Sequence, residues 1–368
     1  MRKKWPKLLN FLTPAKRSHT GMELTGCDKA DALLKQLIAR HEVPGLAICA
    51  SYKGKAWFRG GYGFANLEDN IPVDPERSVF RIASISKPIT ATALACLVAD
   101  GTLDLQTDIR TYVPEFPQRH GPVNLKQLAA HTAGIRSYKG KEFALNRPMQ
   151  IADSLELFVQ DPLEFLPGEG YQYSSLDYVL LSLAMERAAG QPFHILVSER
   201  VLEPLQMSHT VREVPGEPVE NQVEFYTRRG EVFQQSVPVD TRFKLAGGGY
   251  LSTVSDICRL GEAYIQGQLI PPALYEAFLT AQQVGGFSTY YGLGWEVSRD
   301  ARGRSFYGHT GNAIGAYTNF KVFPDQEFVV AILINASTAG VQPILDEVVE
   351  ALHQSLPAAD SMGSAVKS

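Results

Sequence analysis

Two residues at helical spacing, Ser84 and Lys87, form a pair that could carry out covalent chemistry. Positions three apart lie on one face of a helix. A serine hydroxyl is a weak nucleophile until a neighbouring base takes its proton, and a lysine can be that base if its pKa is lowered. Pro88 and the apolar run over residues 89–98 predict a buried helix that begins close to Ser84. The hydroxyl would then lie near the positive end of the helix dipole.

The Ser-x-x-Lys pattern is not specific, because chance produces it about once or twice in a chain of this length. Ser364 and Lys367 match it in the polar C-terminal segment. Taken alone, Ser84 and Lys87 are more typical of a helix cap and a surface lysine. A catalytic interpretation therefore needs further reactive groups in suitable positions.

Tyr173 and Ser175 form the second candidate group. They lie two positions apart in a loop before a predicted helix over residues 176–189, so the loop can present both side chains on one side. A tyrosine phenolate beside a lysine cation could act as the base for Ser84. The alternative is an aromatic loop packed on the helix that follows, which is the commoner role of such a segment alone.

The third candidate group lies in a predicted strand and comprises His309, Thr310, Gly311 and Asn312. Its glycine would let a substrate backbone approach closely, and an edge strand there could bind an extended acyl or peptide group. Backbone N–H groups of this segment could supply half of an oxyanion hole. A histidine at such a position is more often an ordinary strand residue, so the three groups become informative only together.

In order and approximate spacing, the three groups resemble the motifs of the serine β-lactamase and penicillin-binding-protein superfamily. The resemblance covers roughly residues 30–336. It implies an α+β fold, in which helices flank an antiparallel sheet beside a second, all-helical lobe. Segments similar to the class C and esterase-type branch are residues 43–47, 128–134, 167–168 and 246–253. Segments similar to the mitochondrial β-lactamase-like serine proteases are residues 112–117, 131, 134–136 and 161–163.

The resemblance also implies a role for each candidate. Ser84 would be the acylated nucleophile, while Lys87 and Tyr173 would share the base and acid roles. The N–H groups of Ser84 and Asn312 would form the oxyanion hole, and His309 would line the strand beside the pocket. No cofactor and no metal is expected. The residues expected to bind substrate or oxyanion are Ser175, His309, Thr310, Gly311 and Asn312.

Two positions depart from the β-lactamase pattern. Ser175 replaces the usual asparagine of the tyrosine motif, and His309 replaces the usual lysine of the Lys-Thr-Gly motif. A lysine is a permanent cation that can hold a substrate carboxylate, whereas histidine is mostly neutral at pH 7. We therefore expect weak β-lactam hydrolysis, and we expect esters, amides or peptides as substrates.

Three further segments receive lesser roles. We interpret His131 as a helix-end hydrogen bonder, and the glycines at residues 247–249 as making room near the pocket floor. The segment at residues 317–319 could be mistaken for the tyrosine motif. We rank it below Tyr173 because it follows His309 in the chain and lies in a predicted strand.

Composition and charge exclude several classes of protein. The chain has 368 residues, enough for one large domain or two lobes, and a formal net charge of -4. No basic stripe alternates with aromatic residues, which argues against nucleic-acid binding. The four cysteines are scattered, and their spacing indicates neither a zinc site nor a disulfide framework.

Predicted strands lie towards both ends of the chain, and helices fill its middle. If the terminal strands share one sheet, residues 26–90 and 240–356 form an α/β lobe and residues 91–239 a helical lobe, with a ligand cleft between them. The expected helices are residues 28–40, 89–98, 125–129, 154–159, 176–189 and 341–352, with Ser255 capping another. The expected strands are residues 45–52, 56–63, 292–297, 305–308, 316–322 and 328–335.

Both ends of the chain are expected to be disordered: residues 1–25 as a basic tail and residues 357–368 as a tail rich in alanine and serine. The apolar patch at residues 8–12 is too short for a signal peptide or a membrane span. A cytoplasmic protein without an integral membrane segment is therefore the default. A periplasmic or membrane-associated location stays open.

The leading hypothesis is a serine hydrolase that works through an acyl-enzyme on Ser84 and acts on a small ester or peptide substrate. Acyl transfer to an alcohol or amine is a variant of the same chemistry. The alternative is a non-catalytic or scaffolding member of the fold that binds partners or self-assembles. Homo-oligomerisation is left open by the sequence.

Overall fold

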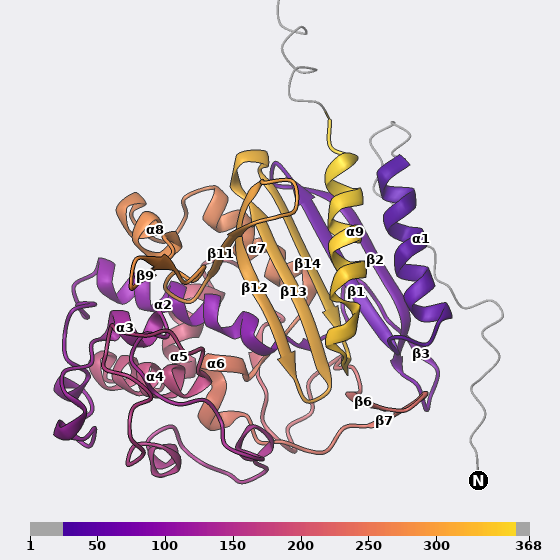
Figure 1. Cartoon of the computed structure of the whole chain (residues 1–368). Coiled ribbons are helices and arrows are strands. Elements are labelled where there is room, and N and C mark those ends of the chain that lie inside the picture. Colours follow the sequence, from indigo (N-terminus) through magenta and orange to yellow (C-terminus); the bar gives the residue numbers. More distant parts are fainter. Residues whose placement is uncertain (1–24, 358–368) are drawn as a thin grey trace, which may run out of the picture.

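The computed structural model describes residues 25–357, and its largest sheet has seven strands in the order β11-β12-β13-β14-β1-β2-β3 (Figure 1). All pairings within this sheet are antiparallel. Strands from the two ends of the chain share the sheet, as expected, because β14 pairs with β1. The strands are β1 (Gly45–Tyr52), β2 (Lys55–Asn66), β3 (Ile71–Pro72), β11 (Glu296–Arg299), β12 (Ser305–Ala313), β13 (Ala316–Phe323) and β14 (Phe328–Ile334).

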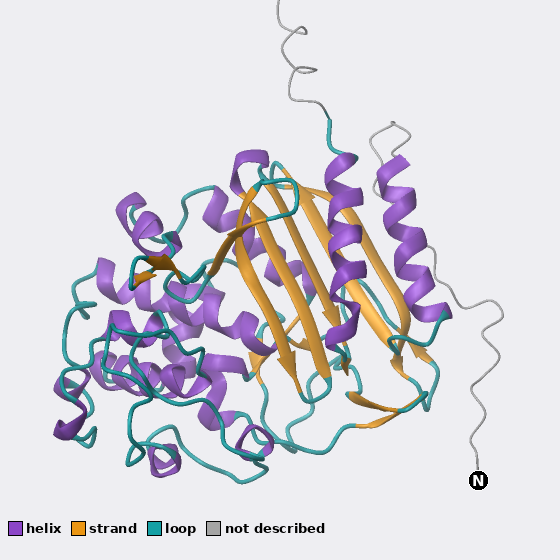
Figure 2. Cartoon of the chain, viewed as in Figure 1, coloured by secondary structure: helices purple, strands orange, loops and turns teal. Residues whose placement is uncertain are grey.

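Helices cover both faces of the sheet and fill the space beside it (Figure 2). The α-helices are α1 (Thr25–Ala39), α2 (Ser86–Ala99), α3 (Leu125–Ala129), α4 (Ser175–Ala189), α5 (Phe193–Val197), α6 (Leu245–Gly248), α7 (Val254–Ile265), α8 (Pro272–Leu279) and α9 (Gln342–Gln354). The short 3₁₀ or π turns are η1 (Ala83–Ile85), η2 (Ile109–Thr111), η3 (Gln118–His120), η4 (Glu142–Ala144), η5 (Asp153–Leu157), η6 (Ser198–Leu202), η7 (Arg242–Lys244), η8 (Pro324–Gln326) and η9 (Ala339–Val341). The remaining strands are β4 (Phe80–Arg81), β5 (Val211–Arg212), β6 (Tyr226–Arg229), β7 (Val232–Gln235), β8 (Tyr250–Ser252), β9 (Gln283–Val284), β10 (Phe287–Ser288) and β15 (Ala336–Ser337).

The central strands are buried on both faces, which explains why their sequences are apolar almost throughout. On β1, Leu46 and Ile48 belong to the core shared with α1 and α9, which lie side by side on one face of the sheet (Figure 1). Ala47 and Cys49 belong to the core on the other face, where α7 packs against β1, β13 and β14. Each fully buried leucine or isoleucine contributes about 1.5–3 kcal/mol to folding.

Helix α2 carries the candidate lysine into the interior. Its residues from Ser86 to Leu97 are all buried, so this helix has no polar face. It contacts α4 and α6, while the preceding turn η1 contacts β12 and α6. The chain therefore holds the Ser84 turn between the edge of the sheet and the buried helices.

Several elements differ from the sequence-based expectations. Ser255 is not the cap of α7, since Thr253 accepts the hydrogen bond from Asp256 N and takes that role. Strand β12 continues five residues past the expected end at Gly308, to Ala313. The region 91–239 also contains β5, β6 and β7, which lack the long apolar runs that mark the central strands. The division into two lobes stays a prediction.

The expectations for the two tails lie outside the described residues, apart from the residues at their inner ends. All four cysteines are buried, and none of them forms a disulfide. Between residues 25 and 357, no group of three or more His, Cys, Asp or Glu side chains could hold a metal ion. No helix in that range combines the length and apolar composition that crossing a bilayer requires.

Gly261 lets α7 lie close to the sheet, so a larger residue at this position should destabilise the protein. A Cβ atom at this position would lie 2.6 Å from Val329 Cγ1 and 3.0 Å from Val322 Cγ2. We expect Gly261→Ala to lower the free energy of unfolding by about 1–3 kcal/mol. The better helix propensity of alanine, worth about 1 kcal/mol, should offset only part of the cost of crowding. Urea unfolding measures the difference.

The control is a double-mutant cycle with Val329→Ala, which removes the atom nearest to the added methyl group. The double variant should be less destabilised than the sum of the two single variants. A Gly261→Ala protein that is more stable than the parent would contradict this account of the packing.

Candidate active site

Ser84 lies in a strained turn at the entrance to α2. Ala83, directly before it, has a φ of 48°, in a region that residues with a side chain seldom adopt. Gly311 on β12 packs against this turn: a Cβ there would lie 2.9 Å from Ala83 Cβ and 3.0 Å from Ile82 O. The glycine of the third motif therefore makes room for the serine turn, a contact that the sequence did not indicate. Its expected contact with substrate stays a prediction.

Lys87 is fully buried, and its amine lies beside the serine. Its Nζ donates hydrogen bonds to Gly247 O at 2.8 Å, Ser175 Oγ at 3.2 Å and Ser84 Oγ at 3.3 Å. Burial lowers the pKa of Lys87 to about 7, while the charges of Asp177 and Glu296 oppose the shift. About half of the amine is therefore neutral at pH 7, and in that form it can accept the Ser84 proton.

Tyr173 contacts the other side of the serine. Its hydroxyl donates a hydrogen bond to Ser84 Oγ at 2.9 Å, and its ring centre lies 4.7 Å from Lys87 Nζ. Burial raises the pKa of Tyr173 far above its ordinary value, although the hydrogen bond with Ser84 opposes this. The phenol is therefore neutral in the free protein. A phenolate base, considered from the sequence, is unfavourable here, and the hydroxyl is available as a proton donor.

His131 packs against the ring of Tyr173, a contact that the sequence analysis did not predict when it gave His131 a role at a helix end. The two ring centres are 4.4 Å apart. His131 Nδ1 lies 2.8 Å from Asp177 Oδ2 and accepts a hydrogen bond from Ser174 N at 3.3 Å. Burial lowers the pKa of His131 and raises that of Asp177, so it favours the neutral form of each group. This pair fixes the loop that carries Tyr173.

His309 is buried at the back of the site and is neutral. Burial and the Lys87 charge lower its pKa to about 3. Its two ring nitrogens lie 2.9 Å from Tyr291 Oη and 2.7 Å from Thr310 O. In the neutral ring, Nδ1–H donates to the carbonyl and Nε2 accepts from the phenol. A fixed positive charge is therefore absent from this position.

Glu296 orients the strand segment that follows His309, and sequence reasoning missed it. Its carboxylate accepts hydrogen bonds from Thr310 N at 3.1 Å and Thr310 Oγ1 at 3.4 Å. Strand β11 pairs with β12 only as far as Gly308, so Glu296 takes the place of a neighbouring strand. N–H groups two residues apart point the same way in a strand. Asn312 N–H therefore also faces away from β13, towards the open edge.

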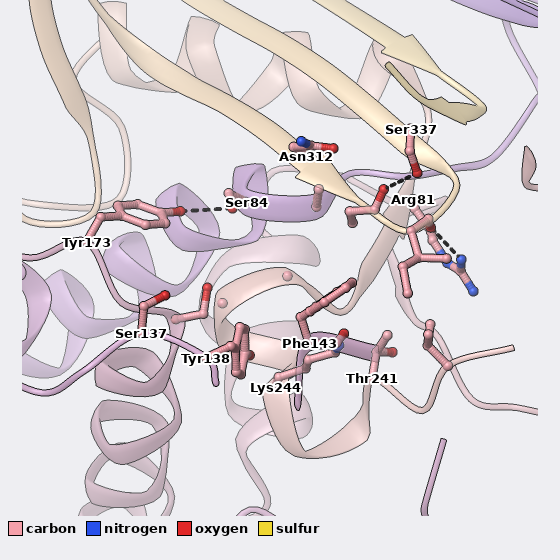
Figure 3. A pocket seen from close by; sticks show the side chains of 17 residues that line it. Arg81, Ser84, Ser137, Tyr138, Phe143, Tyr173, Thr241, Lys244, Asn312 and Ser337 are labelled. Carbon is pink, nitrogen blue, oxygen red and sulfur yellow. Dashed lines mark hydrogen bonds between the residues drawn. The ribbon is translucent and has the colours of Figure 1, made fainter. Parts of the chain in front are cut away.

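A pocket of about 400 Å³ opens beside these groups (Figure 3). Of the expected site residues, Ser84, Tyr173, Ser175 and Asn312 line it, and the Lys87 amine lies behind Ser84 and Ser175. His309, Thr310 and Gly311 are not among its lining residues. Lining residues that sequence reasoning did not single out are Arg81, Ala83, Ser137, Tyr138, Phe143, Val239, Thr241, Lys244, Ala313, Ile314 and Ser337.

Some of the missed lining residues directly adjoin the motifs, namely Arg81, Ala83, Ala313 and Ile314, whereas the others come from segments in which the sequence shows no catalytic motif. The glycines over residues 247–249 were expected at the pocket floor. Gly247 and Gly248 do line the pocket, and the Gly247 carbonyl also binds Lys87. Lys244, three residues earlier, could have been found from its nearness to those glycines. Tyr317 does not line the pocket, and its hydroxyl donates a hydrogen bond to Gln342 Oε1 on α9.

Comparison with known proteins gives the same assignment as the motifs. The sequence model of the Beta-lactamase family matches residues 30–354. Serine beta-lactamase-like protein LACTB, mitochondrial, from Homo sapiens is 27% identical over 408 residues, which span 81% of this chain and 74% of that protein.

Two solved structures share the fold. An octameric penicillin-binding protein homologue from Pyrococcus abyssi superposes with a TM-score of 0.76 at 24% identity, over 89% of this chain and 77% of that one. A D-amino acid amidase from Ochrobactrum anthropi SV3 superposes with a TM-score of 0.79 at 22% identity, over 89% of this chain and 99% of that one. With the family match over most of its length, the chain belongs to the β-lactamase family of serine hydrolases.

Proposed function

We propose that this protein is a hydrolase that forms an acyl-enzyme on Ser84 and cleaves ester, amide or peptide bonds. The observation that supports this most directly is that an amine and a phenol both contact the oxygen of one serine. Ser84 Oγ lies within hydrogen-bonding distance of both the Lys87 amine and the Tyr173 hydroxyl. The lysine has a pKa near neutrality, which suits a general base at physiological pH.

In the proposed acylation step, neutral Lys87 accepts the proton of Ser84 while Oγ attacks the carbonyl carbon of the substrate. The oxygen of the resulting tetrahedral intermediate would be stabilised by the N–H groups of Ser84 and Asn312. Tyr173, which keeps its proton in the free enzyme, would deliver a proton to the leaving group and be reprotonated through Lys87. Water would then attack the acyl-enzyme by the reverse sequence and release the acid.

The neutral strand histidine supports the expectation of weak β-lactam hydrolysis. His309 offers no permanent cation for the carboxylate that a lysine at this position would hold. The expected cytoplasmic location stays a prediction. So does homo-oligomerisation, although the octameric homologue from Pyrococcus abyssi makes it a natural subject for size-exclusion chromatography.

Labelling with a fluorophosphonate tests the nucleophile. Wild type should gain the mass of one phosphonyl group, and peptide mapping should find it on Ser84. Ser84→Ala should gain none, and Lys87→Ala should label at least about 100-fold more slowly because its base is gone. Ser137→Ala removes another hydroxyl of the same pocket and should keep the adduct. A folded wild-type protein that gains no adduct on Ser84 would contradict the proposal.

The rate of that labelling should depend on pH through Lys87. Below pH 7 the amine is protonated and cannot accept a proton, so the rate should fall about tenfold for each pH unit. Above about pH 8 the amine is neutral and the rate should level off. A rate that keeps rising tenfold per unit to pH 10 would instead indicate a lysine of ordinary pKa. Circular dichroism over the same pH range checks that the protein stays folded.

Tyr173→Phe separates the hydroxyl from the ring. Phenylalanine keeps the packing against His131 but removes the hydrogen bond to Ser84. We expect kcat for an amide or alkyl ester, whose leaving group needs a proton, to fall about 100-fold or more, with a melting temperature close to that of wild type. A loss smaller than threefold in a folded variant would exclude the tyrosine from proton transfer.

A further inference from the structure

Two cations line the pocket beside Ser84, and their surroundings differ. Arg81 donates from Nε and Nη2 to Glu213 at 2.8 and 2.5 Å, and from Nη1 to Ile314 O at 2.7 Å. Its charge is therefore compensated by a bidentate carboxylate, and each of its three side-chain nitrogens already donates a hydrogen bond. Arg81 has little to offer a ligand.

Lys244, the second cation, has no such partner. Its Nζ donates to the backbone carbonyl of Phe143 at 2.6 Å, and no carboxylate of the described residues forms an ion pair with it. No aspartate or glutamate lines the pocket within the described range. Because an ammonium group carries three donors, two N–H groups remain for a ligand.

The surroundings of Lys244 keep it charged while limiting its hydration. Burial lowers its pKa to about 8, with a further contribution from the Arg81 charge, and Glu213 and Asp240 oppose the shift. The group is thus mostly protonated at pH 7. Apolar surface from Tyr138, Phe143, Val239 and Ile314 lines the same pocket. A carboxylate that entered would meet this half-buried cation in a partly enclosed site, where charge pairing is stronger than in bulk water.

The position of Lys244 relative to the nucleophile defines which part of a substrate it can contact. Figure 3 shows Ser84 and Asn312 on one wall of the pocket, and Lys244 with Tyr138 and Phe143 on the opposite wall. An acyl group whose carbonyl reaches Ser84 can thus extend its other end across the pocket. The volume of about 400 Å³ is enough for a small acyl chain.

We propose that Lys244 binds a carboxylate at the far end of the acyl group, so that the preferred substrates are acyl compounds carrying a negative charge. This assignment rests on the proposed acyl-enzyme function of Ser84. It makes Lys244 a residue that determines specificity, while the bond-making and bond-breaking steps remain with Ser84, Lys87 and Tyr173.

A matched pair of esters tests the assignment: the mono-4-nitrophenyl ester of adipic acid and its methyl-capped form, which differ in one charge. The selectivity is the ratio of their kcat/KM values. Lys244→Met should lower this ratio about 10- to 100-fold, mainly by raising KM for the charged ester, because a hydrogen-bonded ion pair is lost. Lys244→Arg should retain most of the preference. An unchanged ratio in Lys244→Met, or an equal loss for both esters, would overturn the proposal.

Lys141→Met is the control for net charge. It removes the same charge from an exposed position of the neighbouring loop, outside the pocket, and should leave the ratio unchanged. A fall in the ratio as large as that of Lys244→Met would assign the preference to the overall field of the protein and overturn the proposal. Thermal unfolding followed by circular dichroism identifies variants that fail to fold, and Lys244→Gln serves in place of an unfolded methionine variant.

Binding measurements separate this proposal from the proposed function. If neither ester acylates wild-type Ser84, the acyl-enzyme function fails, but methyl hydrogen adipate can still be compared with dimethyl adipate by ligand-observed NMR. Preferential binding of the charged compound that disappears in Lys244→Met would support a carboxylate site without turnover. Equal binding of the two compounds to wild type would overturn the assignment of Lys244.

Discussion

A buried amine without a carboxylate in contact is the constraint on which the rest of the site depends. The surroundings of Lys87 are a carbonyl, two hydroxyls and the faces of two tyrosine rings. These groups can accept or polarise a proton but cannot compensate a full charge. The change in pKa from 10.5 to about 7 corresponds to roughly 5 kcal/mol in favour of the neutral amine. An ordinary lysine would be neutral in only about one molecule in three thousand at pH 7.

The Lys87 amine can be shielded from water only if the helices around it are apolar on all sides. Helix α2 is buried along nearly its whole length, and so is the first part of α4. A conventional amphipathic helix would bring water to one face and restore the ordinary pKa. Burial acts in the same way on His131 and Asp177 beside Tyr173, because it favours the neutral form of each. A charged imidazolium there would lower the pKa of Lys87 further, while an ionised carboxylate would raise it.

The motifs and their order could be found from the sequence because each is local. The pair at Ser84 and Lys87 is fixed by helical geometry, and β1 was predicted to the residue because its apolar run reflects burial on both faces. Long-range contacts could not be found in this way. Glu296 reaches Thr310 only because β11 begins at Glu296 and pairs with β12 no further than Gly308. Gly311 faces Ala83 only because β12 passes beside the serine turn. Neither contact leaves a pattern in the neighbouring residues.

The phenol–amine pair also shows why residue types alone did not fix the proton donor and acceptor. From the sequence, a lysine cation beside a tyrosine phenolate was as reasonable as a neutral amine beside a neutral phenol. Burial decides between them, because an enclosed ion pair must overcome the desolvation of two charges, whereas the neutral pair avoids both costs. Lys87 is fully buried and Tyr173 is half-buried, and this burial favours the neutral form of each in the free protein. Charge then develops in the site only when Ser84 attacks a substrate carbonyl, because the negative charge moves to the carbonyl oxygen as Lys87 accepts the proton.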